Sequence, residues 1–225
     1  MIPWRSHESR IDALTAVTAW YFENFVEFKI HLVDSTDDVF NLAQARNSGV
    51  ALVADPTEVV IVNDADTIPD ATALRIAISV ARTSGVTHLP YTSYRWLGPS
   101  GTRQLQAGLH PEQCDHHLVP GACSGVYVTT PRSWASHGGQ DERFRGWGFE
   151  DAAWYLAHTT LLGEPPRRNR GVVFALSHDL ELRSGPQYES NAALMKRYRE
   201  ASSDPAAMFE LVAESAESAR LLPGV

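Results

Sequence analysis

Short apolar runs alternate with longer segments of helical spacing through most of the chain. Strands are predicted where the runs occur, over residues 2–6, 26–33, 58–62, 87–94, 125–130 and 172–176. Helices are predicted where apolar residues recur every three or four positions, over 10–25, 40–54, 71–82, 132–137 and 149–162. This alternation is typical of an α/β, Rossmann-like fold, in which helices flank both faces of a mostly parallel central sheet. Ligands of such sheets lie beyond the carboxyl ends of the strands.

Two segments fall outside this alternation. Residues 97–120 are rich in Gly, Pro, His and Gln without clear periodicity, so we expect a long loop beside the ligand site. The C-terminal part predicts two helices, 191–201 and 204–222, with Asp204 as the N-cap of the second and Pro205 in its first turn. We therefore expect one domain over residues 1–182 and a helical extension, 183–225, packed on it.

Composition and charge exclude several classes of protein. The chain has 225 residues, of which 44% are hydrophobic and 20% charged, as in ordinary globular proteins. Its formal charge of -8 disfavours nucleic-acid binding, which requires a basic face. No stretch approaches the roughly 18 consecutive apolar residues of a membrane span, and the N-terminus lacks a secretory signal, so we expect a soluble, cytoplasmic protein without a transmembrane segment.

Two carboxylates follow the apolar run 58–62 closely, in the sequence Asn63-Asp64-Ala65-Asp66. At the carboxyl end of a buried strand they would project toward a bound ligand. Carboxylate oxygens are hard ligands suited to Mn²⁺ or Mg²⁺, and such an ion neutralises the charge that develops on a departing nucleoside diphosphate. The alternative is a solvated turn in which Asp66 or Thr67 caps the next helix.

His178 also follows a predicted strand, which brings it to the same edge of the sheet. It is a third candidate metal ligand beside Asp64 and Asp66. A surface or packing role is the alternative for any single histidine among nine.

The sequence Gly146-Trp147-Gly148-Phe149-Glu150-Asp151 opens a predicted helix. Glu150 and Asp151 lie in its first turn, where free amides and the helix dipole favour an ionised carboxylate, and either is a candidate general base. Trp147 offers a flat apolar face to a sugar ring, and the flanking glycines allow a ligand to approach closely. Simple N-capping by the acids, and core packing by the tryptophan, are the alternatives.

Arg5 and Arg46 are candidates for contacts with a diphosphate, because a guanidinium holds phosphate oxygens with two parallel hydrogen bonds. Surface ion pairs are the alternative for both.

Several of these stretches together resemble the β-1,4-galactosyltransferase family and the catalytic core of polypeptide N-acetylgalactosaminyltransferases. The resemblance covers about residues 1–182 and rests on motifs in the same order: Ile2-Pro3-Trp4-Arg5, Phe40-Asn41, Asp64-Ala65-Asp66, Gly146-Trp147-Gly148 with Glu150-Asp151, and His178.

The resemblance implies a GT-A fold and transfer of a sugar from a nucleotide-sugar donor, a UDP-hexose or UDP-N-acetylhexosamine, to a glycan, glycolipid or protein acceptor. It places Mn²⁺ (or Mg²⁺) on Asp66 and His178 and makes Asp151 the base of an inverting reaction. Asp64 would bind ribose, water or the ion. Contacts with the sugar donor are assigned to Pro3, Trp4, Arg5, Phe40, Asn41, Arg46, Asp64, Ala65 and Trp147, and contacts with the acceptor to Trp147, Gly148, Phe149 and Glu150.

This sequence also departs from the family. Phe149 stands where the galactosyltransferase pattern often has glycine, and Leu42 replaces the arginine that follows Phe-Asn. Two other readings stay open. Asp64-Ala65-Asp66-Thr67 partly matches the nucleophile loop of haloacid-dehalogenase-type phosphatases, and a sugar-binding relative without catalysis would keep the same motifs.

Overall fold

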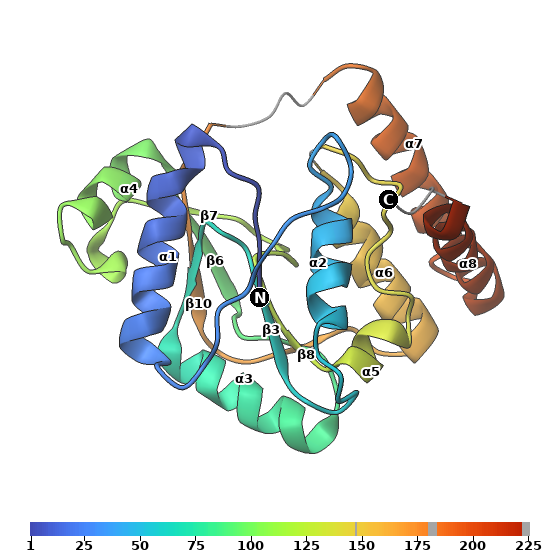
Figure 1. The fold of residues 1–225 in the computed structure, drawn as a ribbon, viewed down its shortest axis with the longest axis horizontal. Coiled ribbons are helices and arrows are strands. Elements are labelled where there is room, and N and C mark those ends of the chain that lie inside the picture. Colours follow the sequence, from blue (N-terminus) through green and yellow to red (C-terminus); the bar gives the residue numbers. More distant parts are fainter. Residues whose placement is uncertain (147, 180–183, 222–225) are drawn as a thin grey trace.

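The computed structural model describes residues 1–146, 148–179 and 184–221, with side chains as far as residue 217 (Figure 1). The helices in this part of the chain are α1 (Ile11–Asn24), α2 (Leu42–Ala51), α3 (Ala71–Ser84), α4 (Gly98–Gln106), α5 (Pro131–Ala135), α6 (Glu150–Leu162), α7 (Pro186–Ala201) and α8 (Pro205–Leu221). Two short 3₁₀ turns, Glu8–Arg10 and Pro111–Gln113, accompany them. None of the described helices has the length and apolar character that crossing a membrane requires.

The strands of the described residues form three sheets. Strands β4 (Thr67–Pro69), β10 (Val172–Leu176), β6 (Ser93–Leu97) and β7 (His117–Leu118) lie side by side in that order. A second sheet has the order β3 (Val60–Asn63), β8 (Val126–Thr129), β5 (His88–Leu89) and β9 (Arg167–Arg168). A short parallel pair joins β1 (Ile2–Pro3) to β2 (Leu32–Val33).

The direction of the strands corrects the expectation of a mostly parallel sheet. β10 runs parallel to β6 but antiparallel to β4, and β8 runs antiparallel to both of its neighbours, β3 and β5. An apolar run shows that a strand is buried, whereas its direction depends on which strand it pairs with.

Most predicted elements form near their predicted bounds, and β10 coincides with its prediction. Residues 26–33 are a correction, because only Leu32 and Val33 find a partner strand, in β1. The strand predicted over 87–94 divides into β5 and β6 at Pro90, which lacks the N–H that a ladder needs. The loop predicted over 97–120 contains α4 and β7, and α4 is anchored by Thr102, which accepts a hydrogen bond from the backbone N–H of Ser177.

The C-terminal helices α7 and α8 pack on α6, at the opposite end of the molecule from α4 (Figure 1). A separate apolar cluster joins them: Phe144, Ala153, Ala157, Met195, Tyr198, Ala201, Met208 and Leu211. The main core fills the space between the sheets and α1, α2 and α3. Helix α6, which carries Glu150 and Asp151, therefore packs against the main core on one side and against α7 and α8 on the other. The predicted domain boundary between residues 182 and 183 lies outside the described residues.

Candidate functional site

A cleft of about 810 Å³ opens where the predicted motifs converge. Its walls come from β1, from the β3–β4 turn, from the residues after β10 and from the start of α6. The predicted site residues that line it are Pro3, Trp4, Arg5, Phe40, Asp64, Ala65, Asp66, Gly148, Phe149, Glu150, Asp151 and His178.

Asp66 and His178 meet in this cleft although they are far apart in sequence. The antiparallel pairing of β4 with β10 brings them together, and the backbone N–H of Leu176 donates to the carbonyl of Asp66 at 2.8 Å. His178 Nε2 lies 3.0 Å from Asp66 Oδ2. This hydrogen bond raises the pKa of His178 above its ordinary value.

The chemistry of this pair fits a divalent ion such as Mn²⁺. One carboxylate oxygen and one imidazole nitrogen lie within a single ion's reach of each other, and both side chains are partly open to the cleft. The described residues contain no group of three or more His, Cys, Asp or Glu side chains placed to bind a metal. Phosphate and water oxygens would have to complete the coordination.

Asp64 points elsewhere. Its Oδ1 accepts a hydrogen bond from Arg46 Nη2 at 2.5 Å, within a buried ion pair. Burial raises the pKa of Asp64 to about 6, and Arg46 opposes that shift. Asp64 lines the same cleft as Asp66 and His178, but its ion-pair partner is Arg46.

Asp151 is held by one of its two oxygens. Oδ1 accepts hydrogen bonds from Arg46 Nη1 at 2.6 Å, from Gln140 Nε2 at 3.3 Å and from the hydroxyl of Tyr127. No hydrogen bond reaches Oδ2 from any described residue. One carboxylate oxygen is thus fixed while the other is available, which suits a general base.

Glu150 differs from its neighbour. It is only 7% exposed, and its Oε2 has no hydrogen-bond partner among the described residues. Burial raises the pKa of Glu150 to about 8, with the charge of Asp151 adding to the shift. Glu150 is therefore largely protonated near neutral pH, and Asp151 is the better of the two candidate bases.

The turn before α6 has unusual backbone geometry. Phe149, the N-cap of α6, has a φ of 80°, the one positive φ of a non-glycine residue in the described ranges. Its ring lies 5.2 Å from that of Tyr188 on α7. Gly148, at a φ of 104°, adopts a conformation that other residues rarely do. The predicted contacts of Trp147 lie outside the described residues.

Two predicted contacts with the sugar donor are corrected by burial. Arg46 is 0% exposed, and its guanidinium is occupied by Asp64, Asp151 and Gln140 rather than facing the cleft. Asn41, 1% exposed, caps α2 by accepting from the N–H of Gln44. Arg46 fixes Asp64 and Asp151 from the buried side of the cleft, and Asn41 fixes the start of α2 and contacts the carbonyl of Glu142.

Arg5 remains at the cleft but has protein partners of its own. Its guanidinium pairs with Asp34 at 2.9 Å and donates to the carbonyls of Ser35, Asp37 and Asp38. It thereby shapes the loop after β2, which forms the wall near Phe40.

The sequence patterns missed several residues of this site. Arg10 lines the cleft, and its charge acts on His178. Tyr127 and Gln140 orient Asp151. Arg10 lies at the start of a helix and Tyr127 inside an apolar strand, so only their position in space reveals them.

No family model and no curated protein matches the chain. Its structure is similar to solved structures of sugar transferases. A Drosophila β1,4-galactosyltransferase 7 mutant in complex with manganese, UDP-Gal and xylobiose shares 19% identity over 75% of this chain and 62% of its own, with a TM-score of 0.50. The Drosophila catalytic domain of that enzyme with xylobiose shares 18% identity over 85% of this chain and 77% of its own, with a TM-score of 0.53.

The third structure is GalNAc-T7 with UDP, GalNAc and Mn²⁺. It shares 10% identity over 96% of this chain, which spans 48% of that structure, and the TM-score is 0.51. The chain also spans less than two thirds of the galactosyltransferase mutant. These likenesses define the class by fold: the chain has the GT-A glycosyltransferase fold, as its motifs predicted.

Proposed function

We propose that this chain is a metal-dependent glycosyltransferase, which moves a sugar from a nucleotide-sugar donor to an acceptor hydroxyl. The observation that carries the proposal is the convergence of Asp66, His178 and Asp151 on one cleft of a GT-A fold. The similar solved structures hold manganese, UDP-Gal or UDP, which supports a UDP-hexose or UDP-N-acetylhexosamine as the donor.

Asp66 and His178 would hold Mn²⁺, or Mg²⁺, which when bound neutralises charge on the leaving diphosphate. Arg10 lies on the same wall and adds a positive charge near those oxygens. Trp4 and Phe40 also line the cleft and would supply apolar surface for the nucleoside.

Asp151 accepts the proton of the attacking hydroxyl at Oδ2. The acceptor oxygen forms a bond to the anomeric carbon, the bond between that carbon and the diphosphate breaks, and the nucleoside diphosphate leaves with the electron pair. A single displacement of this kind inverts the anomeric centre. Arg46 and Tyr127 keep Oδ1 in place, so that Oδ2 does not turn away from the acceptor.

Thermal unfolding with nucleotide sugars and Mn²⁺ tests the proposal, because a ligand that binds only the folded state raises its stability. We expect UDP compounds, and not GDP compounds, to raise the unfolding temperature only when Mn²⁺ is present. Asp66→Ala should abolish both this shift and sugar transfer.

His116→Ala is the matched control, since His116 is exposed and lies outside the cleft. It should behave like the parent protein. Unchanged transfer by Asp66→Ala would contradict the metal assignment. Metal-dependent binding of a UDP sugar without transfer or hydrolysis would instead support the non-catalytic sugar-binding alternative. The phosphatase alternative needs Asp64 as a nucleophile, whereas Asp64 is tied to Arg46.

A further inference from the structure

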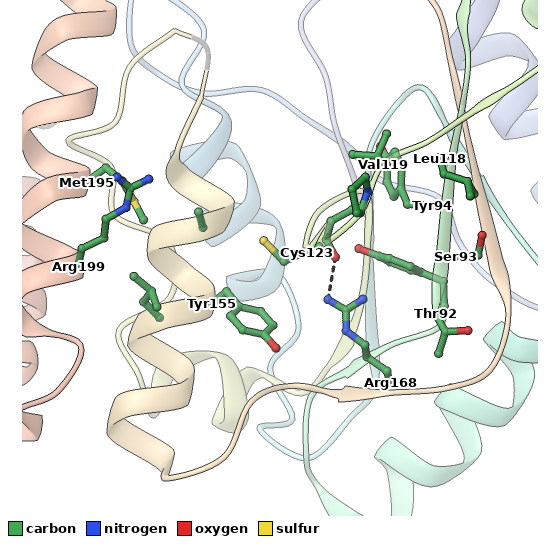
Figure 2. A pocket seen from close by; sticks show the side chains of 16 residues that line it. Thr92, Ser93, Tyr94, Leu118, Val119, Cys123, Tyr155, Arg168, Met195 and Arg199 are labelled. Carbon is green, nitrogen blue, oxygen red and sulfur yellow. Dashed lines mark hydrogen bonds between the residues drawn. The ribbon is translucent and has the colours of Figure 1, made fainter.

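A second groove, of about 860 Å³, crosses the face of α6 (Figure 2). Met195 and Arg199 of α7 lie on one side of α6, and Arg168 and Tyr94 lie on the other (Figure 2). The cavity is open to solvent rather than enclosed, which leaves room for a ligand that extends beyond it.

The groove shares a wall with the cleft that contains Asp66 and His178. Residues 119–123 and Ala152 line both cavities. Ala152 directly follows Asp151 on α6, so a molecule that offers a hydroxyl to Asp151 can extend past Ala152 into the groove. Arg168 supports this shared wall, because its Nη2 donates to the carbonyl of Ala122 at 2.7 Å.

The charge of the groove is opposite to that of the chain. Its described lining contains two arginines, Arg168 and Arg199, and no aspartate or glutamate. The whole chain has a formal charge of -8. Both arginines are exposed, and guanidinium groups bind carboxylate and phosphate oxygens with two parallel hydrogen bonds.

Aromatic side chains also line the groove, and one of them, Tyr155, lies between the two arginines (Figure 2). Tyr155 of α6 points into the groove toward Arg168 (Figure 2). Tyr94 lines the groove and the catalytic cleft alike. An aromatic face with a hydroxyl at its edge suits the apolar face and the hydroxyl groups of a sugar ring.

We propose that this groove binds the part of the acceptor that lies beyond the reacting sugar, and that this part is an acidic glycan carrying carboxylate or phosphate groups. The inference rests on the proposed function, because it identifies the groove as the acceptor side of the same site. Arg168 and Arg199 would engage the acidic groups, and Tyr155 a ring between them.

Calorimetric binding of three disaccharides tests this inference without relying on catalysis. The probes are a neutral glucose disaccharide, its uronic-acid counterpart and its phosphorylated counterpart. We expect at least one acidic probe, the uronic-acid or the phosphorylated disaccharide, to bind about tenfold more tightly than the neutral one. Two partly screened ion pairs would give a difference of this size. The double variant Arg168→Gln/Arg199→Gln should lose that preference.

The matched control is Arg167→Gln/Lys196→Gln. It removes the same charge from the same strand and the same helix, at exposed positions that line neither cavity. It should keep the preference for acidic probes. Equal binding of neutral and acidic probes, or equal losses in the two double variants, would overturn the inference.

A transfer assay with the same probes as acceptors separates this inference from the proposed function. We expect the ratio of kcat/KM for acidic over neutral acceptors to fall about tenfold in Arg168→Gln/Arg199→Gln. Transfer without any acidic preference would overturn the inference alone. Arginine-dependent binding without transfer from any nucleotide sugar would overturn the proposed function and leave the groove as an acidic-saccharide site.

Discussion

Arg46 reaches Asp151 from the buried side of the cleft, with Nη1 2.6 Å from Oδ1. The same guanidinium binds Asp64 through Nη2, so that one cation fixes two carboxylates from different motifs. The buried ring of Tyr127 packs against this guanidinium, with the ring centroid 5.3 Å from Arg46 Cζ. The positions of both acids in the cleft therefore depend on a residue that is fully buried and does not line the cleft.

Replacing Arg46 with Met should lower the free energy of unfolding by about 3–5 kcal/mol, because two buried carboxylates lose their counterion. Chemical denaturation measures the change. Arg167→Met is the control, since this arginine is exposed and lies 3.6 Å from Glu164, and it should cost less than about 1 kcal/mol. Equal stability of the two variants would contradict the central position of Arg46.

Replacing Asp151 with Asn should lower kcat roughly a hundredfold to ten-thousandfold while changing the KM for the sugar donor little. The amide keeps an oxygen for Arg46 and Tyr127 but cannot accept a proton from the acceptor. Tyr127→Phe removes one of the contacts to Oδ1 and leaves the carboxylate, so its kcat should fall less. Steady-state transfer kinetics measure these changes. A kcat equal to that of the parent in Asp151→Asn would show that Asp151 is not the general base.

Glu150→Gln should change how stability depends on pH. The folded-state pKa of Glu150, about 8, exceeds its ordinary value of 4.5, so the folded protein holds a proton that the unfolded chain releases. This contribution is complete below the ordinary value and is lost as pH rises toward the folded value.

The free energy of unfolding of Glu150→Gln, relative to the parent, should therefore rise by about 2–3 kcal/mol between about pH 5 and about pH 7. Denaturation at several pH values provides the measurement. Glu23→Gln, an exposed change on α1, should show no such trend. A flat difference for Glu150→Gln would show that Glu150 is ionised in the folded protein.

Phe149→Gly should be more stable than Phe149→Ala by about 1 kcal/mol. Both variants lose the contact with Tyr188, but only alanine retains a Cβ in the left-handed region. At Ser136, where φ is -64°, the order should reverse and alanine should be the more stable residue. Thermal unfolding of the four variants tests the backbone strain at this turn. The same order at both positions would contradict it.

The sequence predicted much of the frame correctly. Apolar periodicity located β10 and the helices α1, α3 and α6 within a few residues, because burial of one face is written into local spacing. It failed for β2 and for α4. A strand needs a partner, and α4 depends on packing and on the contact of Thr102 with Ser177.

The candidate ligands were likewise accessible from sequence, since acids after a buried strand and a histidine after another are local signals. Their placement at one edge of the sheet was predicted as well, but the contacts that produce it were not. Asp66 meets His178 because β4 pairs with β10, and Arg46 turns inward to Asp64 and Asp151 instead of outward to a phosphate.

The sequence by itself determined which segments bury an apolar face and which polar residues end them. The tertiary structure alone decided strand direction, the pairing of each charge and the difference between Glu150 and Asp151. The physical reason is the separation along the chain of the residues that each effect involves. Hydrophobic spacing acts between near neighbours in the chain, whereas desolvation and ion pairing depend on groups brought together from distant segments.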